Sequence, residues 1–386
     1  MRVFLIAGEL SGDKLGAALM RGLKSRLPDV EFRGVAGPMM QAEGMPSLFE
    51  MSELSIMGIV EVLPKYFALK RRIRETAQAA LDWKADVVIS IDSPDFCLRV
   101  AKILKAQSNI PTVHYVAPSV WAWREGRGPK MAKVIDHVLA LLPFEPPLMQ
   151  KSGMTCDFVG HPIVAEPKAT QADADAFRAS HGLSAETPLI LALPGSRRGE
   201  VSRLGGIFGA ALAQAVKEIP KARVVLPIAP GVRNLVRELV EGWDISPPVI
   251  LLETDSSAAG QAEKRAAFAA ADIALAASGT VSLELAHART PMVIAYDMNW
   301  LSRKMIARLL KVDTVTLVNL VSERRDVPEF LGENCRPENI APALVDLWKS
   351  PQSQLASMEI TMERLGEGGE DPGARAAESV IVALAP

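Results

Sequence analysis

The 386-residue sequence has little of what marks several protein classes. Its three cysteines, Cys97, Cys156 and Cys335, are odd in number and far apart. Their spacing fits neither a disulfide framework nor a zinc-ligand cluster, so a reducing cytoplasm is the simplest compartment. No apolar run reaches the roughly 18 uninterrupted residues that a transmembrane helix needs. Any membrane contact is therefore expected to be peripheral.

An excess of charge of either sign is also missing. The chain has 43 Lys and Arg against 45 Asp and Glu, a net charge of -2. A nucleic-acid-binding protein usually concentrates basic residues on one surface, and nothing in this sequence requires such a surface. Metal-ligand spacing and a Walker lysine are absent too, so no metal and no cofactor are expected.

Length and apolar content indicate two globular domains. Apolar residues make up 49% of the sequence, and a chain of this length is expected to fold as two units of roughly 150 to 200 residues. Pro, Ala, Lys and Thr replace the apolar periodicity from about Pro162 to Asp173, which indicates a linker. We therefore expect domains at 1–165 and 166–365, with a C-terminal helix in 366–386 that packs back on the first domain.

Short apolar runs alternate with helical segments in both halves. The predicted strands are Val3–Ala7, Val30–Ala36, Asp86–Ile91, Pro111–Val116, Val138–Leu142, Leu189–Leu193, Arg223–Pro227, Val249–Leu252, Ile273–Ala276 and Met292–Ala295. This alternation predicts an α/β fold with a doubly wound parallel sheet in each half. Two such halves are expected to face one another across a cleft.

Two turns of the second half carry polar groups directly after a buried strand. Leu189–Leu193 runs into Pro194-Gly195-Ser196-Arg197-Arg198, and Ile273–Ala276 runs into Ala277-Ser278-Gly279-Thr280. Backbone amides at a helix N-terminus bind anions, and an arginine fork matches phosphate oxygens. Glu284, one helical turn after Thr280, suits ribose hydroxyls. The turns thus predict a nucleotide diphosphate site, although plain capped turns, with Thr280 and Glu284 capping and pairing, remain the alternative.

The first half carries polar turns of the same kind. Gly8-Glu9-Leu10-Ser11-Gly12-Asp13 follows the first strand, and Ser11 or Asp13 is a candidate helix cap. Asp92-Ser93-Pro94-Asp95 follows the strand Asp86–Ile91, and a carboxylate there is a candidate general base. Asp95 fits a helix cap better, which leaves Asp92 as the base candidate.

Apolar and aromatic residues form two further candidate surfaces. Between Met57 and Arg74, apolar side chains alternate with a basic cluster, a pattern typical either of a helix on an anionic bilayer or of an amphipathic core helix. The apolar members are Ile59, Val60, Val62, Leu63, Tyr66, Phe67 and Leu69, and the basic ones are Lys65, Lys70, Arg71, Arg72 and Arg74. Trp121 and Trp123 follow the strand Pro111–Val116, where they suit either a sugar or acyl chain or the anchoring of their loop.

Taken together, the motifs resemble those of the lipid-A-disaccharide synthase family over essentially the whole chain. They are Ala7-Gly8-Glu9-Leu10-Ser11-Gly12-Asp13, Gly34-Val35-Ala36-Gly37-Pro38, Met57-Gly58-Ile59-Val60-Glu61-Val62-Leu63, Asp92-Ser93-Pro94-Asp95-Phe96, 114–124, Leu142-Pro143-Phe144-Glu145, Leu193-Pro194-Gly195-Ser196-Arg197 and Ala277-Ser278-Gly279-Thr280. The sequence departs from the family at Ser93, Cys97, Glu323 and Gly332, where Ala, Asn, Gly and Gln are more common.

The resemblance implies a glycosyltransferase with two facing Rossmann-like domains, the GT-B architecture. Such enzymes join UDP-2,3-diacylglucosamine to 2,3-diacylglucosamine 1-phosphate, which gives UDP and a β-1,6-linked disaccharide for lipid A. It also implies a peripheral protein on the cytoplasmic face of the inner membrane. The family's aspartate, arginine and asparagine fall on Asp92, Arg197 and Asn319, and its exposed apolar patch falls on Ile59 to Leu69, which favours the membrane interpretation of that segment.

The resulting hypothesis is an inverting, metal-independent displacement. Asp92 and Arg197 are the expected catalytic residues, and the expected substrate-binding residues are Glu9, Ser11, Gly12, Ser196, Ser278, Gly279, Thr280, Glu284 and Asn319. A UDP-sugar 2-epimerase of the same architecture and a non-enzymatic lipid-binding protein are the alternatives. The sequence leaves open whether Asp92 or Asp95 is the base, and whether the chain forms a homodimer.

Overall fold

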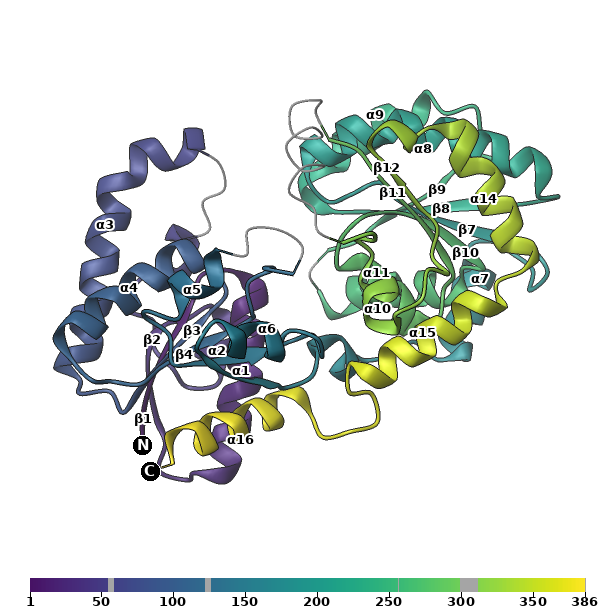
Figure 1. Cartoon of the computed structure of the whole chain (residues 1–386). Helices are drawn as coiled ribbons and strands as arrows, with labels where there is room; N and C mark the ends of the chain where they lie inside the picture. The colour runs from purple at the N-terminus through teal and green to yellow at the C-terminus, as the bar shows by residue number, and fades with distance from the viewer. Residues whose placement is uncertain (55–58, 122–125, 256, 299–311, 386) are drawn as a thin grey trace. The chain divides into compact units, whose positions relative to one another are not determined.

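The computed structural model describes residues 1–54, 59–121, 126–255, 257–298 and 312–385, and within 59–66 it describes the backbone alone. The chain divides into two compact units (Figure 1). The first comprises Met1–Ala165 and Leu365–Pro386, and the second comprises Glu166–Arg364. Each unit has its own sheet and its own core.

The first unit is built on a parallel six-stranded sheet in the order β2-β1-β3-β4-β5-β6. Its strands are β1 (Arg2–Ala7), β2 (Glu31–Val35), β3 (Val87–Ile91), β4 (Thr112–Tyr115), β5 (His137–Ala140) and β6 (Thr155–Phe158). Its helices are α1 (Leu10–Arg26), α2 (Pro38–Ala42), α3 (Ile59–Asp82), α4 (Pro94–Gln107), α5 (Arg127–Met131), α6 (Pro146–Lys151) and α16 (Pro372–Leu384). Helix α1 packs against α16 and α3 packs against α4, and right-handed crossovers put these two pairs on opposite faces.

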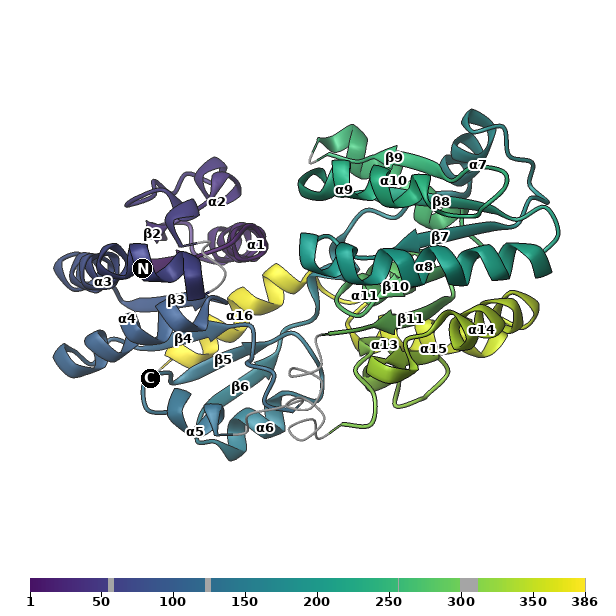
Figure 2. The ribbon, with the colours of Figure 1, turned by 90° about the horizontal axis from the view of Figure 1, so that it is seen from above.

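The second unit has a parallel six-stranded sheet in the order β12-β11-β10-β7-β8-β9. Figure 2 shows β9, β8, β7, β10 and β11 side by side. Its strands are β7 (Leu189–Leu193), β8 (Arg223–Ile228), β9 (Ile250–Glu253), β10 (Ile273–Ala277), β11 (Met292–Tyr296) and β12 (Glu329–Leu331). Its helices are α7 (Gln171–Ser180), α8 (Arg198–Glu218), α9 (Arg233–Glu241), α10 (Ala258–Ala270), α11 (Val281–Ala288), α13 (Leu317–Ser322), α14 (Pro337–Lys349) and α15 (Gln352–Arg364). The two parallel sheets confirm the predicted α/β class.

The burial of the central strands explains why they could be predicted from the sequence. The central strands β3 and β10 are buried along their whole length, as expected for parallel strands covered on both faces, which favour continuous apolar runs. Strand β6 was not predicted, because its residues Thr155-Cys156-Asp157-Phe158 alternate between exposed and shielded positions at the sheet edge. No helix among the described residues is long and apolar enough to span a bilayer.

Candidate functional site

Both sheets reverse their strand order between the strands that carry the predicted polar turns. In the first unit the reversal lies between β1 and β3, and in the second between β7 and β10. Open parallel sheets bind their ligands at the carboxyl ends of the strands that flank such a point. The turns after β1 and β3, and those after β7 and β10, are the ones that the sequence singled out.

The turns after β1 and β3 touch each other. A Cβ atom on Gly8 would lie 2.3 Å from Ser93 Oγ, and one on Gly12 would lie 3.4 Å from the Ile91 carbonyl oxygen. A side chain at Gly8 would therefore push Ser93 away. Glycine lets the backbone of the first turn lie directly against the strand end that carries Asp92.

Asp92 stands in an unusual backbone conformation. Its φ is 50° and that of Ser93 is 44°, so two consecutive residues other than glycine are left-handed. The Asp92 amide donates a hydrogen bond to the Tyr115 carbonyl on neighbouring β4, at 3.0 Å. Val116, the residue after β4, has a φ of 83°. Strain of this kind concentrates at functional sites because the surrounding structure must maintain it.

Neither aspartate caps helix α4. The N-cap is Ser93, without a side-chain cap bond, and Asp95 is exposed in the first turn. The sequence-based assignment of Asp95 as the cap was therefore wrong, because the left-handed turn makes Ser93 the residue before the helix. Asp92 is half-buried beside it.

Asp13 caps a helix other than its own. It is fully buried, and its carboxylate accepts hydrogen bonds from the amides of Gly37, Met39 and Met40 at 3.0, 2.8 and 3.0 Å. It thus caps α2, whereas the N-cap of α1 is Glu9, without a side-chain bond. The predicted capping of α1 by Ser11 or Asp13 was wrong. Ser11 is exposed at the helix start and Gly12 is buried there.

The turn after β7 presents an exposed arginine. Arg197 is the N-cap of α8, and its amide donates to Glu200 Oε2 at 3.4 Å. The Arg197 side chain is 67% exposed and lies 3.6 Å from Glu200 Oε1. Ser196 beside it is exposed. Gly195 has a φ of 122°, which only glycine adopts readily, so the turn brings the guanidinium to the strand edge.

The turn 278–280, after neighbouring β10, is exposed to solvent around Gly279. Ser278 is half-buried, while Gly279 and Thr280 are exposed. Gly279 has a φ of 152°, and a Cβ there would have no atom within 4 Å. Thr280 is the N-cap of α11 but makes no side-chain cap bond, and Glu284 pairs with Lys264 of α10 at 2.6 Å. The alternative of a plain capped turn thus holds in part: Thr280 stands at the cap position without a side-chain bond, and Glu284 forms its pair with Lys264.

Asn319 lies in a different setting from the other predicted binding residues. It is 1% exposed on α13. Its Nδ2 donates to Thr314 Oγ1 at 3.1 Å and to the Val327 carbonyl at 2.9 Å, and its Oδ1 accepts from the Val327 amide at 3.0 Å. Both ends of the side chain therefore hold the segment before β12 in place.

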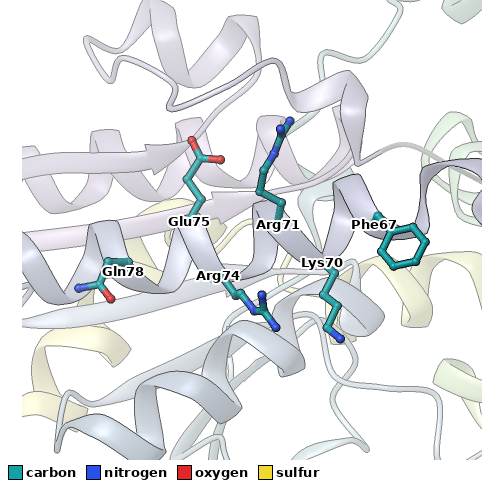
Figure 3. A pocket seen from close by; sticks show the side chains of 6 residues that line it. All are labelled: Phe67, Lys70, Arg71, Arg74, Glu75 and Gln78. Carbon is teal, nitrogen blue, oxygen red and sulfur yellow. The ribbon is translucent and has the colours of Figure 1, made fainter.

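The predicted membrane patch falls on α3. The side chains of Ile59, Val60, Val62, Leu63 and Tyr66 lie outside the described part of the structure, Phe67 is 82% exposed and Leu69 is half-buried. An open groove of about 770 Å³ runs along this helix and is lined by Phe67, Lys70, Arg71, Arg74, Glu75 and Gln78 (Figure 3).

Arg72 departs from the basic cluster in which the sequence placed it. Its Nε and Nη2 donate to Glu53 at 2.9 and 2.7 Å, and its Nη1 donates to Glu75 at 2.8 Å. The guanidinium also stacks 4.4 Å from the centroid of the Phe49 ring. Arg72 therefore anchors α3 to the preceding segment rather than adding to the exposed charge.

One buried carboxyl group of the first unit, which follows strand β5, was missed as a functional candidate. Glu145, in the turn after β5, is 4% exposed. Its oxygens accept from Trp121 Nε1 at 3.3 Å and from the Leu142 amide at 3.0 Å. Burial raises the pKa of Glu145 to about 7. The signal available in the sequence was a glutamate closing the apolar run Leu142-Pro143-Phe144.

Among the described residues, no group of three or more His, Cys, Asp and Glu side chains could hold a metal ion. All three cysteines are free and buried. Burial raises the pKa of Cys97 and raises that of Cys156 to about 12, so both stay in the thiol form at neutral pH.

Comparison with known proteins decides the family. The family profile described as lipid-A-disaccharide synthetase matches residues 3–383. The chain is 62% identical to the lipid-A-disaccharide synthase of Ruegeria pomeroyi over 383 residues, which cover 99% of this chain and 95% of that protein. The chain belongs to the lipid-A-disaccharide synthase family. The enzyme of that name from Pseudomonas syringae is 42% identical, with 99% of this chain and 97% of that protein covered.

Solved structures with the same fold are much more distant in sequence. UDP-GlcNAc 2-epimerase from Neisseria meningitidis, bound to UDP-GlcNAc, has a TM-score of 0.62 at 14% identity and covers 99% of this chain and 98% of its own. The Anabaena protein HepE, in complex with UDP and glucose, has a TM-score of 0.58 at 12% identity and covers 100% and 99%. These similarities confirm the predicted fold.

Membership of the lipid-A-disaccharide synthase family confirms the sequence resemblance and the predicted enzyme class. The protein is a glycosyltransferase of lipid A biosynthesis. It is therefore neither an idle lipid-binding module nor, on its family, an epimerase.

Proposed function

We propose that this chain condenses UDP-2,3-diacylglucosamine with 2,3-diacylglucosamine 1-phosphate to give UDP and the β-1,6-linked disaccharide. Family membership supports the overall reaction. The observation that carries the residue assignment is topological: the turns after β1, β3, β7 and β10 all lie where their sheets reverse strand order.

In this proposal Asp92 is the general base. The acceptor's 6-hydroxyl oxygen attacks the anomeric carbon of the donor sugar while Asp92 takes the hydroxyl proton. The bond from that carbon to the diphosphate breaks, and UDP leaves with the electron pair. Attack opposite to the leaving group inverts the configuration. The left-handed backbone and the half-buried position of Asp92, which caps no helix, support this role.

Arg197 and the turn 278–280 serve the leaving diphosphate. The guanidinium is exposed at the end of β7, and the turn after the neighbouring strand β10 has open space in front of Gly279. Positive charge and backbone amides aimed at a departing phosphate are often the largest contribution to catalysis. Ser196 adds a hydroxyl at the same edge, and Glu284 binds the ribose hydroxyls.

Of the remaining predicted residues, some are proposed to bind the acceptor and one to hold the site's structure in place. Glu9, Ser11 and Gly12 lie at the start of α1, where the turn contacts the Asp92 segment, and they hold the acceptor. Asn319 positions the segment before β12 through its own hydrogen bonds. Helix α3, with exposed Phe67 and its basic neighbours, rests on the cytoplasmic face of the inner membrane as a peripheral contact.

The test is UDP release that depends on the acceptor. Mixed with donor and acceptor in detergent, the purified protein should release UDP only when both are present, whereas an epimerase would act on a UDP-sugar alone. General-base assistance is worth ~10²- to 10⁴-fold, so Asp92→Asn should lower turnover by about that factor. The matched control Asp95→Asn should stay near the wild-type rate.

Binding of UDP tests the other half of the assignment. Arg197→Ala should weaken UDP binding measured by calorimetry by about 10- to 100-fold, because it removes a charge-assisted contact to the diphosphate. Unchanged UDP affinity and turnover in Arg197→Ala would remove that residue from the site. Near-normal turnover in Asp92→Asn, or a large loss in Asp95→Asn, would identify a different base.

A further inference from the structure

The carboxylate of Glu284 is held by a lysine from the preceding helix. Glu284 lies in the first turn of α11, and its amide donates to the Thr280 carbonyl at 3.4 Å. Lys264, on α10, donates from Nζ to Glu284 Oε2 at 2.6 Å. The lysine thus reaches from one helix to the turn that follows β10.

Lys264 is itself held on a second side. Its Nζ lies 5.2 Å from the centroid of the Phe268 ring, one helical turn along α10, and Phe268 is buried. The side chains of Lys264 and Glu284 are only 27% and 37% exposed. A pair shielded to this degree, with a cation–π contact behind it, keeps a more defined geometry than a freely exposed surface pair.

This arrangement leaves part of the carboxylate available. An ionised carboxylate accepts about four hydrogen bonds through its two oxygens, and Lys264 occupies one position on Oε2. Among the residues that the structure describes, no other side chain pairs with Glu284. Oε1 therefore keeps its acceptor capacity, and the Glu284 side chain is 37% exposed, one helical turn from the turn 278–280.

We propose that Lys264 is a positioning residue that fixes Glu284 for the ribose of the nucleotide donor. By taking Oε2, Lys264 orients the carboxylate so that Oε1 accepts from the 2′- and 3′-hydroxyls, while Lys264 itself does not touch the nucleotide. This inference rests on the proposed function, in which the turns after β7 and β10 hold UDP.

The discriminating measurement compares UDP with 2′-deoxy-UDP. The two ligands share base and diphosphate, so the ratio of their dissociation constants reports the 2′-hydroxyl contact alone. Wild type should prefer UDP by about 10-fold, since a hydrogen bond to a charged group is worth roughly that much or more. Lys264→Met should reduce this preference to nearly 1 by weakening UDP binding, and Lys264→Arg should retain most of it.

Lys217→Met is the matched control. Lys217 lies in the last turn of α8, at the end of that helix away from Arg197, and forms an ion pair of 3.5 Å with Asp244. Lys217→Met therefore removes one positive charge from the same unit, as Lys264→Met does. It should keep the wild-type preference. Equal weakening of both ligands in Lys264→Met, or a preference that stays at the wild-type value, would overturn the proposal.

Glu284→Gln distinguishes a failure of the positioning role of Lys264 from a failure of the proposed nucleotide site. If Glu284→Gln abolishes the preference for UDP and Lys264→Met does not, only the positioning role of Lys264 fails. If wild type binds neither ligand, or if Arg197→Ala leaves UDP affinity unchanged, the proposed nucleotide site itself fails. In the double variant Lys264→Met/Glu284→Gln, the loss should not exceed that of Glu284→Gln alone, because the lysine acts only through the glutamate.

Discussion

At the scale of single residues, a buried carboxyl group settles how one loop is held. The sequence left open whether Trp121 contacts a ligand or anchors its loop. Its ring packs edge-to-face on Phe144, with centroids 5.4 Å apart, and its Nε1 donates to Glu145. These contacts favour anchoring for Trp121. Trp123 lies outside the described residues.

Glu145 makes this anchor dependent on pH. Burial raises its pKa from 4.5 to about 7, although hydrogen bonds from the Leu142 amide and Trp121 oppose the shift. A raised pKa means that the folded state binds more protons than the unfolded one. The stability that Glu145 contributes is thus fully present below about pH 4.5 and is lost as pH rises through about 7.

The indole of Trp121 should report this titration. In protein labelled with ¹⁵N-tryptophan, we expect the Trp121 Nε1–H resonance to shift with an apparent pKa of about 7, assigned by its loss in Trp121→Phe. Glu145→Gln should abolish the shift. Desolvation lowers the pKa of buried His114 and of half-buried His161 to about 4, so both stay neutral in this range. A resonance that stays constant between pH 5 and pH 9 would show that Glu145 keeps one charge state.

Helix caps show what a single sequence cannot tell at this scale. Polar residues were correctly expected at helix starts, yet Asp13 serves α2 rather than its own helix and Asp95 serves none. A short carboxylate binds whichever amides the fold brings near. That choice depends on residues more than twenty positions away, such as Gly37, and local spacing does not contain it.

At the scale of elements, strands were easier to predict than helices near the site. Buried parallel strands appear as continuous apolar runs, and Leu189–Leu193 was predicted with its observed bounds. The segment around Asn319, which is not among the strands predicted from the sequence, forms the short helix α13 before the three-residue β12. Glu323, where the family more often has Gly, ends that helix with a φ of 60°.

Helix α3 shows how one element combines anchoring with an exposed face. Arg72 ties it to Glu53 and Phe49, while Phe67, Lys70 and Arg74 lie along one side of the helix (Figure 3). A bulky apolar side chain that is 82% exposed beside cations is what the proposed peripheral membrane contact requires. The anchor keeps this face turned outward.

Vesicle binding tests that face. Phe67→Ser should weaken binding to vesicles of anionic lipid by about 10- to 100-fold, since burying an aromatic side chain is worth roughly 1.5 to 3 kcal/mol. The remaining binding should fall with added salt, because each surface cation contributes about 1 kcal/mol. Leu355→Ser, at an exposed leucine of α15 in the other unit, is the control and should bind as wild type. Equal effects of the two variants in a co-sedimentation assay would argue against α3 as the contact.

At the scale of the whole molecule, the first unit is built from two separate stretches of the chain, one before and one after the second unit. Helix α16 follows the second unit in sequence, yet Ala376, Ala377 and Val380 belong to the core of the first unit. Figure 1 shows α16, near the C-terminus, beside α1 near the N-terminus. The core of the second unit contains no residue of α16 among those described. The first unit is therefore completed only by the last residues of the chain.

A glycine contact makes this packing testable in the full-length protein. A Cβ on Gly373 would lie 2.6 Å from the Ala18 carbonyl oxygen of α1, so Gly373→Ala must push the two helices apart. Overpacking of this kind costs about 1 to 3 kcal/mol, and the loss should fall on the first unit alone. Hydrogen exchange followed by peptide should speed up in α16, α1 and the first sheet, while the second sheet keeps its wild-type protection.

Gly206 provides the matched control, because a Cβ there would have no atom within 4 Å. Gly206→Ala, inside α8, should leave exchange in both sheets unchanged or slightly slower, since alanine favours helix by about 1 kcal/mol over glycine. Faster exchange in both sheets of Gly373→Ala would mean that the two units unfold as one. Exchange unaltered in both would mean that α16 is not needed to complete the first core. We expect faster exchange in the first sheet only, because the two cores share no described residue.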